Sequence, residues 1–211
     1  MPKKKLIFIT LLGILFFIPL FLFRNLGPLD FWWWMSLNLI VLLSFVFISD
    51  HGYKKILRQD FLSHPIRKIA LGVFSALVLY GVFFAGNYFS RLILPIADEG
   101  IQGVYNFKGN ADALRIALSM LLIIGPGEEL FWRGFLQRNL EPYLGKWGGF
   151  ALGVLIYTGV HVFTGNLMLI TAALTAGLFW GWMYAKYRSM LMNIVSHTVW
   201  DVVVFVVLPF A

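Results

Sequence analysis

The chain of 211 residues contains no cysteine and few charged residues. Without cysteine it can form no disulfide framework, and it offers neither a thiolate nucleophile nor a thiolate metal ligand. Charged residues make up 13% of the chain, whereas an ordinary soluble domain carries about 25%. In their place, 60% of the residues are hydrophobic and 18% are aromatic. This composition predicts a polytopic membrane protein of the all-α class, built as a transmembrane helical bundle.

Acidic residues are the scarcer charged type, and the formal net charge is +7. In a soluble protein this excess would raise the possibility of nucleic-acid binding. In a membrane protein it is better explained by loop Lys and Arg that fix topology at an anionic leaflet. The expected partner is therefore the lipid bilayer, and no nucleic acid is expected.

Windows of about 20 apolar residues predict seven transmembrane helices. Their approximate ranges are 6–23, 31–49, 69–88, 113–135, 148–163, 167–185 and 191–208. The first helix follows three lysines but lacks a small-residue cleavage motif, so we expect a retained anchor rather than a signal peptide. Because no linker or internal repeat interrupts the chain, residues 1–211 are predicted to form one membrane domain. Within it, residues 1–112 carry no recognisable motif, and residues 113–208 carry the candidate catalytic core.

The distribution of positive charge predicts the orientation. With the N-terminus inside, 13 of the 17 Lys and Arg fall on the inner side and 4 on the outer side. The inner set is Lys3, Lys4, Lys5, Lys54, Lys55, Arg58, Arg67, Lys68, Arg133, Arg138, Lys146, Lys186 and Arg188, and the outer set is Arg24, Arg91, Lys108 and Arg115. The positive-inside rule therefore favours an N-terminus on the cytoplasmic side.

Two connecting segments are long. Residues 50–68 are predicted to form a basic inner loop, in which His51 and His64 are interpreted as solvated side chains. Residues 91–112 form the longest outer loop, interpreted either as a solvated connection or as a gate over a site.

Two adjacent carboxylates, Glu128 and Glu129, lie in the fourth predicted span, with Arg133 one helical turn further on. Ionisable residues in a membrane span are costly and mark functional sites. Pro126 predicts a helix restart, which would place both carboxylates in a first turn favoured by the helix dipole. Glu129 and Arg133 have the i,i+4 spacing of an ion pair. Glu128 is then the freer carboxylate and the candidate general base, with an inert ion-paired cluster as the alternative.

Two further spans carry histidine. Tyr157 and His161 share one helix face, as do His197 and Asp201, because each pair is spaced i,i+4. Each motif alone is weak, since a single His in an apolar helix is as often structural as functional. The predicted spans place His161 toward the outer half, His197 toward the inner half and Glu128 below the middle of the membrane. One shared site therefore requires these boundaries to shift by a few residues.

Taken in order, the motifs Glu-Glu-x-x-x-Arg, Tyr-x-x-x-His and His-x-x-x-Asp resemble those of the CPBP family of intramembrane proteases. That family includes type II CAAX prenyl endopeptidases and bacteriocin-processing proteins. The resemblance covers about residues 113–205 and departs from the family pattern at two positions. Tyr157 stands where Phe is usual, and Asp201 stands where Asn is common. A carboxylate at the second position is a poorer hydrogen-bond donor to an oxyanion than an amide.

The resemblance implies hydrolysis of a peptide bond in a membrane-tethered substrate, for example a prenylated protein or a C-terminal tail. The catalytic residues that it implies are Glu128, Glu129, Arg133, His161, His197 and Asp201. Glu128 with His161 would activate the water, and His197 with Asp201 would stabilise the oxyanion. A Zn²⁺ ion held by Glu128, His161 and His197 is chemically reasonable as well. The sequence does not decide between these mechanisms, and we favour the metal-independent one.

Two other classes of function fit the sequence. One is a non-enzymatic immunity or scaffold protein that retains the motifs, and the other is a transporter that uses Glu128 and Glu129 as a proton relay. A transporter would be expected to show two repeated halves with matched broken helices, whereas this chain has only one interrupted span. From the compact chain of 24.1 kDa, we expect the cytoplasmic membrane of a bacterium.

Overall fold

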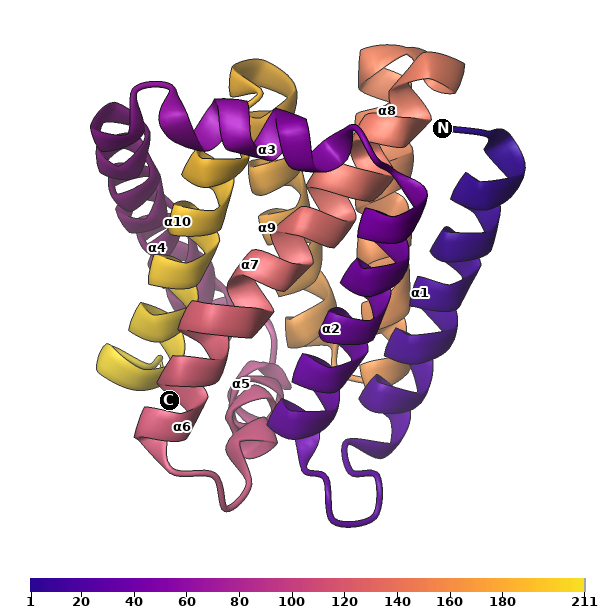
Figure 1. The fold of residues 1–211 in the computed structure, drawn as a ribbon. Coiled ribbons are helices and arrows are strands. Elements are labelled where there is room, and N and C mark those ends of the chain that lie inside the picture. The colour runs from indigo at the N-terminus through magenta and orange to yellow at the C-terminus, as the bar shows by residue number, and fades with distance from the viewer. Residues whose placement is uncertain (211) are drawn as a thin grey trace.

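The computed structural model describes residues 1–210 as a bundle of helices, and no β-strand occurs within that range. Figure 1 shows the long helices side by side, with the N-terminus and α3 at one end of the bundle and α5 at the other. The fold class predicted from composition, an all-α helical bundle, is confirmed.

The helices have well-defined bounds. In chain order they are α1 (Lys3–Phe23), α2 (Phe31–Ser49), α3 (Tyr53–Leu62), α4 (Pro65–Ile93), α5 (Ala97–Tyr105), η1 (Asn106–Lys108), α6 (Ala113–Ser119), η2 (Met120–Ile124), α7 (Gly125–Glu128), η3 (Glu129–Gln137), α8 (Arg138–His161), η4 (Val162–Thr164), α9 (Leu167–Tyr187), α10 (Met190–Val202) and η5 (Val203–Val207).

Five of these helical segments are long and apolar enough to cross a membrane: α1, α2, α4, α9, and α10 together with η5. The other two predicted spans coincide with the segmented helix from α6 to η3 and with the part of α8 beyond Gly145. At Gly145 a positive φ of 73° divides α8 into two pieces, a conformation that glycine adopts without strain. The chain is an integral membrane protein, while the number of seven spans and the N-terminal orientation stay predictions.

The helix restart predicted at Pro126 is wrong. Ile124 and Gly125 keep right-handed helical backbone angles, so the chain enters α7 without a break. Immediately before the proline, η2 is a π-helical turn in which the Gly125 N–H donates to the Met120 carbonyl, five residues back. In an α-helix, proline cannot donate to the carbonyl four residues back, and its ring clashes with that carbonyl. The wider π-helical turn changes the hydrogen-bond partners just before Pro126 and gives the ring room. Glu128 and Glu129 therefore lie inside a continuous helix rather than at its first turn.

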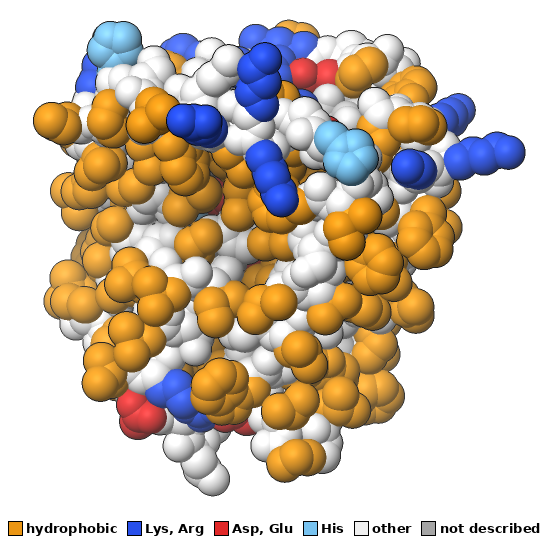
Figure 2. Space-filling view, viewed as in Figure 1, with side chains coloured by type: hydrophobic (Ala, Val, Ile, Leu, Met, Phe, Trp, Pro, Cys, Tyr) orange, Lys and Arg blue, Asp and Glu red, His pale blue; other side chains and the backbone are white. Residues whose placement is uncertain are grey.

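Both long connections contain a helix that the sequence did not predict. The inner segment forms α3, which lies across the end of the bundle in Figure 1, and the outer segment forms α5. His51 and His64, which flank α3, are exposed, in agreement with their interpretation as solvated side chains. On the face shown in Figure 2, most Lys and Arg gather at the α3 end, above a broad band of hydrophobic side chains.

The α4 and α10 helices pack closely at Gly72. A Cβ added there would lie 2.8 Å from the Val195 Cβ and 2.9 Å from the Met192 carbonyl oxygen. Small residues let membrane helices approach this closely, so that packing can hold them together. One turn further along α4, buried Ser75 donates a hydrogen bond to Ser196 of α10 at 2.9 Å.

We expect Gly72→Ala to destabilise the protein by about 1–3 kcal/mol, because the added methyl group overpacks a backbone contact. Gly81→Ala is the matched control on the same helix, since a Cβ at Gly81 meets nothing within 4 Å. Thermal unfolding of both variants in detergent measures the difference. Equal midpoints for the two variants would contradict the packing argument.

Candidate functional site

The polar centre of the bundle begins with the ion pair between Glu129 and Arg133. The Arg133 Nη1 lies 2.7 Å from the Glu129 Oε1, and both side chains are almost completely buried. The Arg133 guanidinium also lies over the ring of Tyr157, 4.6 Å from its centroid. The pair predicted from the i,i+4 spacing is therefore present, and it has no access to solvent.

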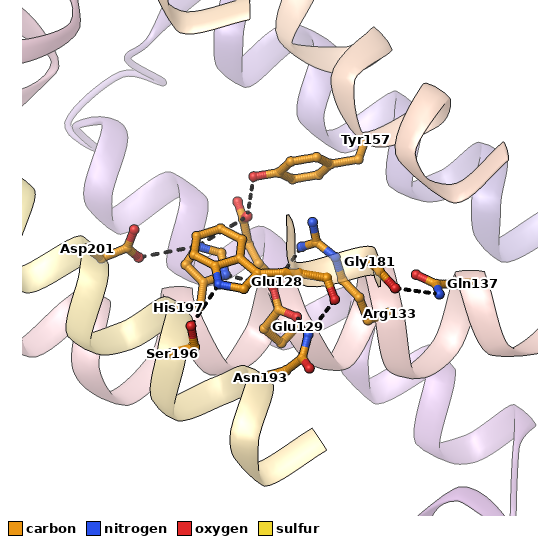
Figure 3. A network of polar contacts seen from close by, with 11 residues as sticks. Glu128, Glu129, Arg133, Gln137, Tyr157, Gly181, Asn193, Ser196, His197 and Asp201 are labelled. Atoms are coloured by element: carbon orange, nitrogen blue, oxygen red, sulfur yellow. Dashed lines mark hydrogen bonds and ion pairs between the residues drawn. The ribbon is translucent and has the colours of Figure 1, made fainter. Parts of the chain in front are cut away.

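Glu129 is the hub of contacts between helices. His197 of α10 donates from Nδ1 to the Glu129 Oε1 at 2.8 Å, and Asn193, one turn earlier, donates from Nδ2 to Oε2 at 2.9 Å. Figure 3 shows these side chains converging on Glu129 from α10. With Arg133 in addition, Glu129 has three partners, so its carboxylate orients the site and is not free to react.

Glu128 is the freer of the two carboxylates. Its only hydrogen bond in the described chain comes from the Tyr157 hydroxyl, which donates to Oε2 at 3.2 Å. The same oxygen lies 3.9 Å from the His197 Nε2. The hydroxyl that distinguishes Tyr157 from the usual Phe therefore has a defined contact.

His161 ends α8, one turn beyond Tyr157. Its Nδ1–H donates to the Tyr157 backbone carbonyl at 2.7 Å, which fixes the ring and the tautomer. Its Nε2 makes no hydrogen bond within residues 1–210 and can meet a water or a substrate. The sequence placed His161 and Glu128 at different depths in the membrane. Tyr157 connects the two, because its hydroxyl donates to Glu128 and its backbone carbonyl accepts from His161.

His197 lies between three carboxylates. Its Nδ1 is bonded to Glu129, and its Nε2 lies 3.5 Å from the Asp201 Oδ2 as well as 3.9 Å from Glu128. The ring stacks on Trp180 of α9, with centroids 3.7 Å apart and planes 19° apart. The Trp180 Nε1–H in turn donates to the Ser196 hydroxyl at 3.1 Å. Trp180 was missed by sequence reasoning, because nothing in the composition of α9 indicates which aromatic ring faces a histidine on another helix.

A cavity of about 510 Å³ brings the candidate residues together. Glu128, His161, His197 and Asp201 line it, whereas Glu129 and Arg133 lie behind its wall. The remaining lining is mostly apolar, and the motif-free N-terminal helices contribute to it through side chains such as Phe21 and Met35. The arrangement is a few convergent polar groups in an apolar pocket, as is typical of a ligand site.

The donor geometry does not fit a metal site. Within the described residues, no group of three His, Cys, Asp or Glu side chains is spaced to hold an ion. Of the candidates Glu128, His161 and His197, the last has Nδ1 engaged by Glu129, and its Nε2 lies nearer to Asp201 than to Glu128. These contacts give the zinc alternative no support, whereas a carboxylate beside histidines in a cavity suits acid–base chemistry.

Comparison with known protein families gives a match to part of the chain. Residues 110–203 match the family described as type II CAAX prenyl endopeptidase Rce1-like, and residues 1–109 lie outside the match. The chain matches no curated protein and no solved structure. The matched segment contains all three motifs and agrees with the range that the motifs indicated. The match supports membership of the CPBP family of intramembrane proteases.

Proposed function

We propose that this chain is an intramembrane endopeptidase that hydrolyses a peptide bond in a membrane-tethered protein or peptide. The observation that carries the proposal is the convergence of Glu128, His161 and His197 on one cavity within the bundle. The family match supports protease activity in general. The substrate class and the roles given to individual residues are ours.

In the proposed reaction, Glu128 removes a proton from a water molecule as the water oxygen adds to the scissile carbonyl carbon. His161 orients this water through Nε2. As the carbon–nitrogen bond breaks, Glu128 passes the same proton to the leaving amine nitrogen. General acid–base catalysis of this kind contributes about 10²–10⁴-fold to a rate.

His197 stabilises the oxyanion from Nε2–H in this mechanism. The carboxylates of Glu129 and Asp201, on either side of the ring, balance the positive charge that His197 carries when both nitrogens are protonated. Trp180 holds the plane of the ring, and Arg133 holds Glu129. A donor fixed before the reaction costs no reorganisation in the transition state.

The test is proteolysis by purified protein in liposomes, using a library of peptides anchored by an apolar segment, some of them lipidated. New termini found by mass spectrometry with the wild type, and absent with Glu128→Gln, would support the protease. If neither protein cleaves the library, the immunity or scaffold interpretation gains. A pH gradient across the liposomes that collapses only when Glu128 is intact would favour the proton-coupled transporter.

We expect Tyr157→Phe to lower the cleavage rate by up to about tenfold, since one hydrogen bond of about 0.5–1.5 kcal/mol is lost while the ring is kept. Tyr157→Ala should lose far more, because the ring also packs against His161 and Arg133. Steady-state rates on one cleaved peptide measure both variants. A Tyr157→Phe variant as inactive as Tyr157→Ala would show that the hydroxyl itself takes part in the chemistry.

A further inference from the structure

We propose that substrate reaches the cavity from the end of the bundle opposite the basic loops, and that the scissile bond meets Glu128 near the middle of the membrane. The substrate class is then a membrane-anchored polypeptide presented from the extracytoplasmic side. The term substrate rests on the proposed protease function, whereas the route of access does not.

The first observation is the position of the lining residues along their helices. Most come from the part of their helix that lies toward α5, and none comes from α3. Examples are Phe21, Met35, Ser90, Tyr105, Leu167 and Phe205. Glu128 and His197 lie at the inner end of the cavity, midway along the bundle. The cavity therefore runs from the centre of the membrane toward the α5 end.

The second observation is that the opposite side of Glu128 is sealed. Buried Gln137 donates from Nε2 to the Gly181 carbonyl at 3.0 Å, which ties η3 to α9. Tyr53, at the start of α3, is buried and donates to the Leu130 carbonyl at 3.0 Å. Gly134 packs so tightly on the Tyr53 hydroxyl that a Cβ there would collide with it. These contacts pack the bundle closely between Glu129 and the basic end.

The α3 helix closes that end further. Asp60 of α3 accepts hydrogen bonds from the Leu191 N–H at 2.9 Å and from the Ser189 hydroxyl at 3.3 Å, both at the start of α10. Lys68 pairs with Asp60 at 2.7 Å. At the other end of α3, Arg138 of α8 pairs with Asp50. Contacts at both ends hold α3 across the bundle, so opening this side would break several part-buried polar contacts at once.

The third observation is a lateral mouth between α4 and α9. Gly86 of α4 and Thr171 of α9 both line the cavity and are exposed at the surface of the bundle. The α5 helix forms the rim, held by the Asn166 Nδ2, which donates to the Gly100 carbonyl at 2.7 Å. The Tyr105 hydroxyl adds a donated bond to the Val204 carbonyl at 3.1 Å. An opening toward the lipid suits a substrate that is itself anchored in the bilayer.

Charge assigns the two ends to the two sides of the membrane. The sealed end carries α3 and the lysines that begin α1, and the positive-inside rule makes it cytoplasmic. The mouth therefore faces the outer leaflet. A C-terminal tail presented from the cytoplasm would meet the sealed side.

Because the chain contains no cysteine, single cysteines can be introduced without a background. Gly86→Cys reports on the mouth, and Gly81→Cys is the matched control, exposed on the same helix but outside the cavity lining. A Cβ at either position meets nothing within 4 Å. Asn110→Cys and Gly52→Cys mark the exposed segments at the α5 end and the α3 end. The probe is a membrane-impermeant thiol reagent, applied to intact cells and to inside-out vesicles.

We expect Gly86→Cys and Asn110→Cys to be labelled in intact cells, and Gly52→Cys only in inside-out vesicles. Gly81→Cys should react at least about tenfold more slowly than Gly86→Cys, because an apolar surrounding disfavours the reactive thiolate. Thr171→Cys, across the mouth, should follow Gly86→Cys. Labelling of both mouth positions only from the Gly52 side, or from neither side, would overturn the proposal.

Labelling does not depend on proteolysis, so the two proposals can fail separately. If the chain cleaves peptides in liposomes, external reagent on Gly86→Cys should abolish cleavage relative to the same variant before labelling, while Gly81→Cys keeps its rate. Labelling from the outside without any peptide cleavage would support the proposed route of access and contradict the protease function. Cleavage of a peptide supplied only on the cytoplasmic side, which Gly52 marks, would support the protease function and contradict the proposed route of access.

Discussion

Glu128→Gln is expected to abolish cleavage and to leave the protein folded. The substitution keeps the size of the side chain and an oxygen that can still accept the Tyr157 hydrogen bond, but it removes the base. Loss of a general base typically costs about 10²–10⁴ in rate. The measurement is the initial rate on a peptide that the wild type cleaves, together with the thermal midpoint in detergent. His161→Ala should reduce the rate by a similar factor.

Glu99→Gln is the control for Glu128→Gln. Glu99 is exposed on α5 and lies outside the cavity lining, so neutralising it should change neither rate nor stability. If the Glu128→Gln variant cleaves at the wild-type rate, another carboxylate must be the general base. Asp201 would then be the first candidate, because it lines the cavity, whereas Glu129 is buried among three partners.

Local spacing in the sequence predicted the parts of the site that lie on single helices. The i,i+4 rule identified the pair of Glu129 with Arg133 and placed His197 and Asp201 on one face, since both depend only on helix geometry. The same rule left Glu128 as the freer carboxylate. It could not predict contacts between different helices. The stacking of Trp180 on His197 depends on how α9 and α10 are rotated and tilted, which spacing does not determine.

The fold shows the same division. Long apolar runs predicted the spanning helices, and the expected range 31–49 agrees with α2 at both ends. The short helices α3 and α5 were predicted as loops. A hydropathy window of about 20 residues does not detect a helix of about ten mixed polar and apolar residues, because their hydropathies cancel in the average. Pro126 was taken as a break, although the π-helical turn before it keeps the helix continuous.

Arg133→Ala should have the largest effect on stability. It removes the only cation near Glu129 that is always charged, and it leaves the carboxylate buried with His197 and Asn193. Breaking one partner of a buried ion pair costs about 3–5 kcal/mol. For a chain of this size, that lowers Tm by on the order of 10 °C. We therefore expect less folded protein as well as lost activity, in contrast to Glu128→Gln.

Arg188→Ala is the matched control for Arg133→Ala. Arg188 pairs with Glu141 at 2.6 Å, close to the distance in the buried pair, but its side chain is 43% exposed. Exposed pairs contribute about 0–1 kcal/mol, so this variant should unfold near the wild-type temperature. The double variant Glu129→Gln with Arg133→Met removes both charges. It should be less destabilised than the sum of its single variants, because the double variant leaves no unpaired charge of the pair, whereas each single variant leaves one. A monodisperse and fully active Arg133→Ala protein would show that Glu129 does not need its partner, and that His197 is positioned by other contacts.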